Sequence, residues 1–387
     1  MNDHGNPTLL LLQFGCFSIT LVLTLVLLIS RIHQRPESRS YEASRWMLIA
    51  ALSLYTVHYL LQMLFGFRAQ GEDVGALINI LFYLPSAFLL ASATLRLATG
   101  QRYMKRFVII GIAGILISLL LFLIGLVQYG SLHMPWILRI MGVLYVVMIL
   151  FFIFHPGGEL RRMNRKIEDE TADDISDYRL YMHSGSVMLY TMGLIGALSI
   201  FHTSSVFAVA AFFLLALIFY VVSFVALGFN ISPLSSIIDE REATADREVP
   251  AAPVSEAKSV EEPPVEAPTT SRLTIEQTTR IEAAIADWRA EHGYSAQNLT
   301  SITMAQRLGI SKRQLTQYLA ETVGVTFRVW LSDIRIDEAK RMLLAEPAYS
   351  IEAIAEMCGF SSRSWMQEKF KSSTGMTPND WREAQKA

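Results

Sequence analysis

Two clusters of polar residues near the end of the chain have the side-chain types that read base edges in duplex DNA. Arginine bonds bidentately to guanine and glutamine to adenine, whereas lysine and hydroxyl groups more often contact phosphate. A glycine and a serine precede each cluster, at Gly309 and Ser311 and again at Gly359 and Ser361. The predicted base contacts are Arg313, Gln314, Thr316, Gln317, Arg363, Ser364 and Gln367, and the predicted phosphate contacts are Lys312, Ser362 and Lys371.

A repeated motif predicts the helices that position these residues. Ala305 precedes Gly309 by four positions, as Ala355 precedes Gly359. The small alanine lets two helices approach, the glycine accepts a positive φ at the corner, and the serine caps the next helix. The motif therefore predicts two helix-turn-helix units, at about 299–322 and 350–373.

The surrounding sequence predicts an all-helical domain over residues 272–387. Thr274 and Gln277 form a capping-box pattern at its first helix. Apolar residues at helical spacing over about 327–344 predict a long helix that joins the two units. Within the second helix of each unit, the residues expected to face the core are Leu315 and Leu319, and Trp365, Met366 and Phe370.

At this point the chain resembles the AraC/XylS-type transcription regulators. The resemblance covers roughly residues 272–387, and the residues that carry it are Ile351, Ile354, Ala355, Gly359, Phe360, Phe370, Lys371, Gly375, Thr377, Pro378, Trp381 and Arg382. It implies two recognition helices on one rigid domain that enter successive major grooves. Glu368 departs from the pattern, because family members often have a basic residue there and a carboxylate would repel phosphate.

The rest of the chain resembles the membrane-embedded members of that family in architecture. The chain is 52% hydrophobic and its mean hydropathy is +0.35. Seven apolar segments are long enough, or nearly so, to cross a bilayer. They lie at residues 9–30, 46–67, 74–95, 107–127, 136–154, 185–201 and 206–229. The predicted fold class is all-α, with a polytopic seven-helix transmembrane domain over residues 1–235.

The distribution of basic residues predicts the orientation of these segments. The loops after the first, third and fifth segments carry most of the Lys and Arg of this region. The alternate loops carry only Arg68, and the N-terminal tail carries none. By the positive-inside rule the N-terminus lies outside. An odd number of crossings then places residues 272–387 in the cytoplasm, as expected for a multi-pass protein of the bacterial inner membrane.

The composition of residues 236–271 predicts an acidic, proline-rich linker. This stretch contains five prolines, nine acidic residues and three basic residues. Such a composition cannot bury enough apolar surface to offset the entropy of ordering, so we expect a disordered tether. A tether argues against a rigid helical connection from the seventh segment. Dimerisation or proteolysis would be easier routes for a signal.

Polar side chains within the apolar segments predict a ligand pocket. Those of the second segment form one stripe at helical spacing, and all except Tyr55 fall in the outer halves of the second, third and fifth segments. Polar groups within a membrane are costly and usually functional. The predicted lining residues are Tyr55, His58, Gln62, Asn79, Tyr83 and Arg139. Arg139 would suit an anionic group. The alternative is that these residues form interhelical hydrogen bonds and place tyrosines at the interface.

Several function classes are disfavoured. None of the seven segments contains a Lys, so a rhodopsin, which binds retinal through a lysine Schiff base, is excluded. None contains an Asp or Glu, which transporters often have within the membrane. Cys16 and Cys358 lie in different domains, so we expect neither a disulfide nor a metal cluster. Without a nucleophile–base pair or a phosphate loop, we expect no enzyme activity and no cofactor.

The expected partners follow from the two domains. Residues 273–387 carry 14 basic and 14 acidic residues, so non-specific DNA affinity should be modest and binding should depend on a homodimer. The expected partners are double-stranded DNA, the lipid bilayer, a second copy of the chain and an unknown small-molecule or protein signal, with RNA polymerase a further candidate. The rival interpretation is a membrane sensor or carrier whose C-terminal domain binds a protein instead of DNA.

Overall fold

The computed structural model describes residues 7–30, 39–98, 101–201, 206–229 and 272–385. The chain forms two compact units. The first consists of Met1–Asn164 and Ser176–Ile231, and the second of Arg165–Ile175 and Ser232–Ala387. The linker predicted over residues 236–271 lies outside the described residues.

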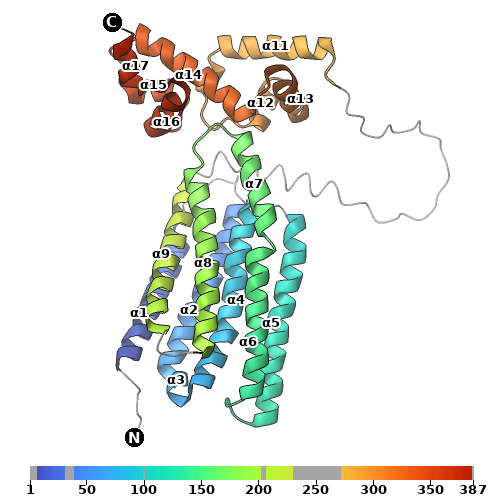
Figure 1. The fold of residues 1–387 in the computed structure, drawn as a ribbon, viewed down its shortest axis with the longest axis vertical. Coiled ribbons are helices and arrows are strands. Elements are labelled where there is room, and N and C mark those ends of the chain that lie inside the picture. The colour runs from blue at the N-terminus through green and yellow to red at the C-terminus, as the bar shows by residue number, and fades with distance from the viewer. Residues whose placement is uncertain (1–6, 31–38, 99–100, 202–205, 230–271, 386–387) are drawn as a thin grey trace, which may run out of the picture. The chain divides into compact units, whose positions relative to one another are not determined.

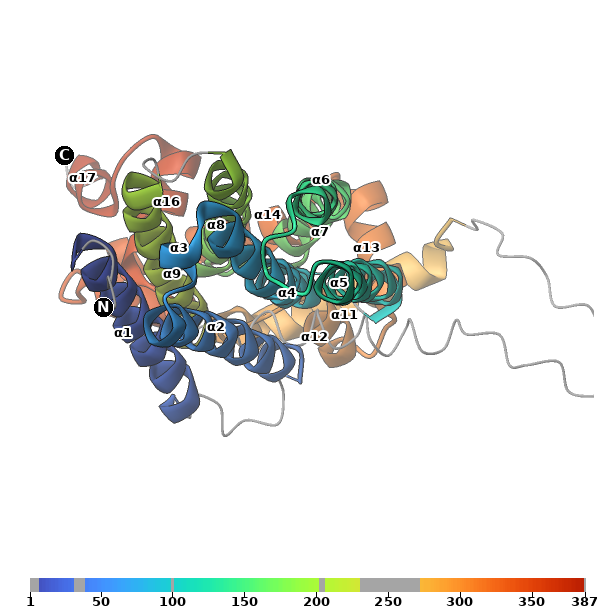
Figure 2. The same ribbon diagram turned by 90° about the horizontal axis from the view of Figure 1, so that it is seen from below.

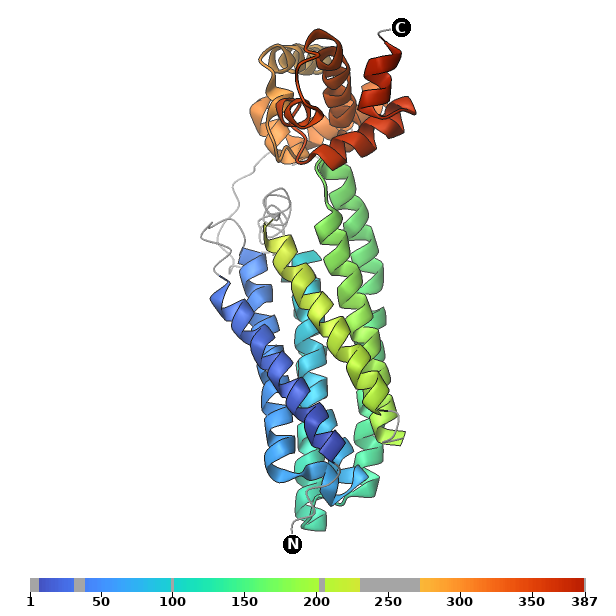
Figure 3. The same ribbon diagram turned by 90° about the vertical axis from the view of Figure 1, so that its left-hand side faces the viewer.

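The first unit is a bundle of long helices (Figures 1 and 3). Its helices run side by side, with the short helix α3 at one end. They are α1 (Pro7–Ile29), α2 (Arg39–Phe65), α3 (Phe67–Gln70), α4 (Glu72–Ala98), α5 (Gln101–Tyr129), α6 (Pro135–Phe154), the beginning of α7 (Gly157–Glu170), α8 (Ser176–Phe201) and α9 (Val206–Phe229).

Helix α4 lies inside this bundle and packs against α2, α3, α5, α6 and α8 (Figure 2). Helix α5, by contrast, leaves most of its apolar surface uncovered, including Leu116 and Leu120. Water would penalise an apolar surface of this extent, whereas lipid tails would not. The bundle therefore has the burial pattern expected of helices that insert into a membrane.

Six of the described helices are long and apolar enough to cross a bilayer: α1, α2, α4, α5, α6 and α9. The segment predicted at residues 185–201 belongs to α8, which is not among the six. Helix α8 nevertheless packs against α4, α6 and α9, so it shares the bundle with three of them. The seventh crossing stays a prediction.

The described part of the second unit is all-helical, as predicted. Its helices are α11 (Ile275–Ala290), η1 (Gly293–Ser295), α12 (Ser301–Arg307), α13 (Lys312–Tyr318), η2 (Leu319–Val323), α14 (Phe327–Ala345), α15 (Ile351–Met357), α16 (Arg363–Thr374) and α17 (Pro378–Ala384). Helix α13 is shorter than the predicted element, because the chain widens into the π-helical turn η2 after Tyr318.

Helix α14 joins two hydrophobic cores, which confirms its predicted role. Its first half contributes Trp330 and Leu331 to a core with α11, α12 and α13. Its second half contributes Met342 and Leu343 to a core with α15 and α16. Because one continuous helix belongs to both cores, the two helix-turn-helix units are held on a single element.

The predicted turns and caps form, with one correction. Gly309 and Gly359 adopt positive φ angles of 65° and 83°, and Ser311 caps α13. The cap of α16 is Ser362, not Ser361 as the repeated motif implied. The second turn is one residue longer than the first, so matching the motifs from their glycines misplaces the cap.

The second unit also contains a segment that the predicted division assigned to the membrane domain. Arg165–Ile175 comprises the end of α7 and the connection to α8, yet it clusters with the helix-turn-helix units. Thr171 forms an isolated antiparallel bridge with Thr300. The described residues contain no other β-structure, which confirms the all-α class for this part of the chain.

Candidate functional site

Helix α13 begins with a reciprocal cap that uses one of the predicted base contacts. The Gln314 backbone N–H donates to Ser311 Oγ at 3.2 Å, and Gln314 Oε1 accepts from the Ser311 backbone N–H at 2.9 Å. This arrangement satisfies two amide groups that the helix start leaves unpaired. In this structure the side chain of Gln314 therefore belongs to the cap.

The other predicted residues of α13 differ in their surroundings. Arg313 and Thr316 are exposed at the helix surface. Gln317 is half-buried and donates to Glu321 Oε1 at 3.0 Å. Lys312 is also half-buried, and its Nζ lies 3.0 Å from Oε1 of Glu170. Of this cluster, Arg313 is the cation placed at the surface.

Helix α16 exposes the second cluster. Arg363, Ser364 and Lys371 are exposed and Gln367 is half-buried. Ser362 is the cap, because its Oγ accepts from the Trp365 backbone N–H at 3.1 Å. Both predicted core faces are confirmed. The residues buried there are Leu315, Leu319, Trp365, Met366 and Phe370.

The exposed face of α16 carries a mixed charge. Glu368 is exposed between the predicted contacts Gln367 and Lys371. Lys369 Nζ lies 4.2 Å from the centre of the Trp365 ring, a distance at which a cation is attracted to the aromatic face. The predicted second recognition surface therefore includes one carboxylate beside its cations.

Comparisons with known proteins agree with this geometry. Residues 304–384 match the family described as "Helix-turn-helix domain". The chain is 35% identical over 72 residues to the "HTH-type transcriptional activator RhaR" of Salmonella arizonae, and equally to that of Salmonella enteritidis PT4. The C-terminal domain is an AraC-type helix-turn-helix domain.

These matches cover only part of each chain. The match covers 19% of this chain and 25% of the length of the Salmonella relatives. Two solved structures are also similar. The C-terminal domain of AraT, a response regulator from Geobacillus stearothermophilus, is 25% identical over 30% of this chain and 88% of its own, with a TM-score of 0.25. A transcriptional regulator from Chromobacterium violaceum is 23% identical over 30% of this chain and 97% of its own, also at 0.25.

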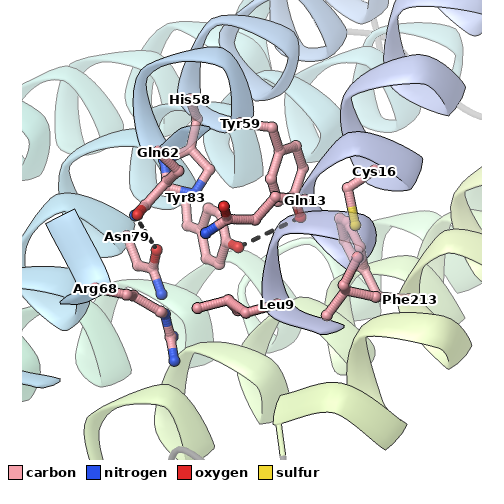
Figure 4. Close-up of a pocket in the computed structure, with 11 residues that line it drawn as sticks. Leu9, Gln13, Cys16, His58, Tyr59, Gln62, Arg68, Asn79, Tyr83 and Phe213 are labelled. Carbon is pink, nitrogen blue, oxygen red and sulfur yellow. Dashed lines mark hydrogen bonds between the residues drawn. The ribbon is translucent and has the colours of Figure 1, made fainter. Parts of the chain in front are cut away.

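A second candidate site lies within the membrane bundle (Figure 4). The pocket has a free volume of about 40 Å³, which is room for roughly three water molecules. It is lined by residues of α1, α2, α3, α4 and α9: Leu9, Leu12, Gln13, Cys16, His58, Tyr59, Gln62, Arg68, Asn79, Tyr83 and Phe213.

The structure brings four of the six predicted pocket residues together: His58, Gln62, Asn79 and Tyr83. Tyr55 is buried beside them, with its ring 5.6 Å from that of Tyr83 and its hydroxyl 3.1 Å from Met192 Sδ. Arg139 does not line the pocket. It is exposed on α6, with its guanidinium 4.6 Å from the ring centre of Trp136, one turn earlier on the same helix.

Among the described residues, the cation that lines the pocket is Arg68, which the sequence predicted in an outer loop. Gly66 has a φ of 57° and ends α2, so the chain turns into the short helix α3 that carries Arg68. A Cβ at Gly75 of α4 would lie 2.5 Å from Arg68 Cγ. The glycine thus makes room for the arginine. Arg68 is the lone basic residue of the predicted outer loops. This feature of the sequence could have identified Arg68 as a candidate pocket residue.

Polar atoms in this pocket lack partners. Within the described part of the chain, neither His58 Nδ1 nor Gln62 Oε1 has a hydrogen-bond partner, although both are buried. When the Asn79 amide is oriented with its oxygen toward Arg68, this oxygen accepts a hydrogen bond of 3.0 Å from Arg68 Nη2. The Asn79 amide nitrogen then donates to His58 Nε2 at 3.2 Å. A buried, unpaired polar atom is costly, so the pocket is chemically suited to a small polar molecule.

Proposed function

We propose that this chain is a membrane-bound regulator of transcription that binds specific DNA sequences through its AraC-type domain. One observation carries the proposal: a single helix, α14, holds two helix-turn-helix units, and each unit exposes an arginine near the start of its second helix. Arg313 and Arg363 are those residues. Exposed arginines at the starts of two such helices suit base contacts in successive major grooves.

The proposal includes the cellular location. The apolar helices of the first unit suggest insertion into a membrane. We place the chain in the bacterial inner membrane with its N-terminus outside, because the basic loops predict that orientation. In this topology the AraC-type domain lies in the cytoplasm, where DNA is available.

Paired domains would raise affinity. The AraC-type domain has no excess of positive charge, because residues 273–387 carry 14 basic and 14 acidic residues. A homodimer presents four recognition helices, and the second domain binds at the high effective concentration set by the first. RNA polymerase is a further partner that we propose on the ground of the regulatory function alone.

We also propose that the membrane pocket binds the signal, a small molecule with an anionic group. Arg68 would pair with the anion, and His58 and Gln62 would hydrogen-bond the rest. Thermal unfolding of the full chain in detergent, with formate, acetate and lactate as probes, tests this idea. We expect at least one carboxylate to raise the melting temperature of the wild type and of Arg139→Ala but not of Arg68→Ala. If Arg139→Ala abolishes the rise in melting temperature and Arg68→Ala keeps it, Arg139 binds the anion, as the sequence predicted.

Chromatin immunoprecipitation of the full-length protein tests the DNA function. We expect discrete peaks for the wild type that disappear in the Arg313→Ala/Arg363→Ala double variant. A control variant, Arg280→Ala/Arg289→Ala, removes the same charge from exposed positions of α11 and should keep the peaks. No peaks for any form, at equal membrane levels and in several growth conditions, would refute DNA binding.

The second candidate function is recognition of a protein partner by the AraC-type domain. The exposed Glu368 and the balanced charge of the domain favour it, because both weaken attraction to DNA phosphates. The same immunoprecipitation distinguishes the two functions. Peaks that depend on Arg313 and Arg363 would show DNA binding and would contradict the second candidate function.

A further inference from the structure

An acidic segment that comprises the end of α7 and part of the α7–α8 connection is packed into the AraC-type domain. Residues 168–174 read Glu-Asp-Glu-Thr-Ala-Asp-Asp, so five of the seven residues are acidic. They lie about a hundred residues before the domain in sequence, yet they belong to the same compact unit. A run of acidic residues is ordinarily solvated, so burial of part of this run requires specific partners.

The centre of the segment is anchored in the domain by apolar and backbone contacts. Ala172 is fully buried in the core shared with Trp288 and Leu331. Its carbonyl oxygen accepts a hydrogen bond of 3.0 Å from Trp365 Nε1, on the second recognition helix. Thr171 pairs with Thr300, the cap of α12. The segment therefore contacts elements of both helix-turn-helix units.

A buried ion pair fixes the segment to α14. Arg335 NH1 lies 3.1 Å from Asp173 Oδ1, and the side chains are 0% and 1% exposed. The other guanidinium nitrogens of Arg335 donate to the carbonyl oxygens of Tyr294 and Ala296. Burial raises the pKa of Asp173 and lowers that of Arg335, and the opposite charge of each partner opposes the shift. Without Asp173 the domain would hold an unpaired buried charge.

The segment also engages a residue predicted to contact DNA. Glu170 Oε1 lies 3.0 Å from Nζ of Lys312, the first residue of α13. The Glu168 carbonyl oxygen accepts from Arg328 NH1 at 3.4 Å, and Arg328 lies over the ring of Trp365. The Glu170 carboxylate thus pairs with a lysine that is a predicted phosphate contact, and it adds negative charge next to helix α13.

The contact is incompletely satisfied. Within the described residues, Asp173 Oδ2 and Glu170 Oε2 are buried without a hydrogen-bond partner. Each such atom costs free energy in the docked arrangement, which favours a contact that can be released. Release would expose both carboxylates to water and remove the Glu170 contact from Lys312.

We propose that residues 168–174 are an autoinhibitory segment that competes with the DNA backbone for the start of α13. This inference rests on the proposed DNA-binding function. In the docked state the domain binds DNA weakly; in the released state it binds fully. The segment connects α7 to α8, and α8 is a helix of the first unit, so movement of α8 would transmit a signal to the segment through the chain itself. DNA and the membrane bundle would then act on the same equilibrium.

The test uses the full chain in lipid nanodiscs and a DNA duplex of the sequence most enriched by immunoprecipitation. Three variants are compared. Asp173→Asn breaks the buried pair, and Glu170→Gln weakens the contact with Lys312 while leaving the anchor in place. Asp169→Asn is the matched control, because it removes the same charge from an exposed side chain of the same segment. Fluorescence anisotropy measures DNA affinity, and hydrogen exchange measures protection of the amides of residues 168–174.

We expect Asp173→Asn to tighten DNA binding at least about tenfold, Glu170→Gln by about threefold or more, and Asp169→Asn by less than about twofold. Asp173→Asn should also lose amide protection in the segment. Because coupling is reciprocal, saturating DNA should speed exchange of the same amides in the wild type. Should Asp173→Asn disturb folding, Glu170→Gln and the effect of DNA on wild-type exchange decide the question.

Two results would overturn the inference. One is a wild type that binds DNA with the same affinity as Asp173→Asn and Glu170→Gln. The other is a segment whose amides stay protected when DNA is saturating. In both cases DNA binding itself stands and residues 168–174 are a structural part of the domain. If no form binds DNA and immunoprecipitation yields no peaks, the proposed function fails and the inference fails with it.

Discussion

The two helix-turn-helix units share a motif but differ in register and in neighbours. Helix α13 begins at Lys312 directly after its cap Ser311, and α16 begins at Arg363 after Ser362. Counted from the caps, Arg363 corresponds to Lys312, not to Arg313. The extra residue in the second turn thus shifts every side chain of α16 by about 100° around the helix relative to a match from the glycines.

This register changes the expected chemistry of the second unit. Counted from the caps, Glu368 corresponds to Gln317, a predicted base contact of the first unit. The acidic segment adds another difference, because it pairs with Lys312 on α13 through Glu170 but contacts α16 through the buried Trp365. The comparison teaches that a repeated motif can keep the turn glycine while the length of the turn and the predicted recognition surfaces differ.

The turn glycines should give the largest difference between the units. A Cβ at Gly359 would lie 2.4 Å from the Tyr294 carbonyl oxygen, whereas a Cβ at Gly309 meets no atom within 4 Å. Both residues have positive φ. We expect Gly359→Ala to destabilise the domain by about 2–5 kcal/mol, from strain plus overpacking, and Gly309→Ala by only about 1–2 kcal/mol. Thermal unfolding followed by tryptophan fluorescence measures both, and equal losses would contradict the comparison.

Alanine substitutions at the two exposed arginines should give the next largest effect. We expect Arg313→Ala and Arg363→Ala each to weaken DNA binding by about 1–3 kcal/mol. Binding to a panel of single-base variants of the enriched duplex shows what each arginine contacts. Loss of base preference marks a base contact. If Arg363→Ala weakens binding to all sequences equally, Arg363 contacts phosphate and its assignment as a base contact is wrong.

Removal of the two helix caps should cause a smaller loss of stability. Ser311 belongs to a reciprocal capping box with Gln314, whereas Ser362 accepts a single hydrogen bond from Trp365. We expect Ser311→Ala and Ser362→Ala each to cost about 1 kcal/mol, with the larger loss at Ser311. Hydrogen exchange of the α13 and α16 amides measures the two losses separately. A larger loss at Ser362 would argue against the reciprocal cap.

The smallest effect should come from Glu368. We expect Glu368→Gln to strengthen DNA binding by less than about 1 kcal/mol and to raise the salt dependence, because an exposed charge that repels phosphate is removed. Glu276→Gln, at an exposed position of α11, serves as the control and should change neither quantity. Affinity measured over a series of salt concentrations tests both variants. If Glu368→Gln changes neither the affinity nor its salt dependence, the Glu368 side chain does not lie near the DNA.

The sequence by itself determined the elements of the AraC-type domain. Thr274, Ser311, Gly309 and Gly359 act on their own helix ends and turns, and such signals are local. The apolar spacing of α14 likewise predicted its place between the two cores. Helix starts, positive-φ turns and buried faces depend on residues within one or two turns, so they can be read from a single chain.

The tertiary structure alone decided which distant residues meet. The pairing of Asp173 with Arg335 joins positions 162 residues apart, and no periodicity predicts it. The pocket cation is Arg68 instead of Arg139, because a short helix after Gly66 turns Arg68 toward α4 while Arg139 faces away. Side-chain partners across the chain depend on the packing of whole elements, and sequence spacing contains no information on that packing.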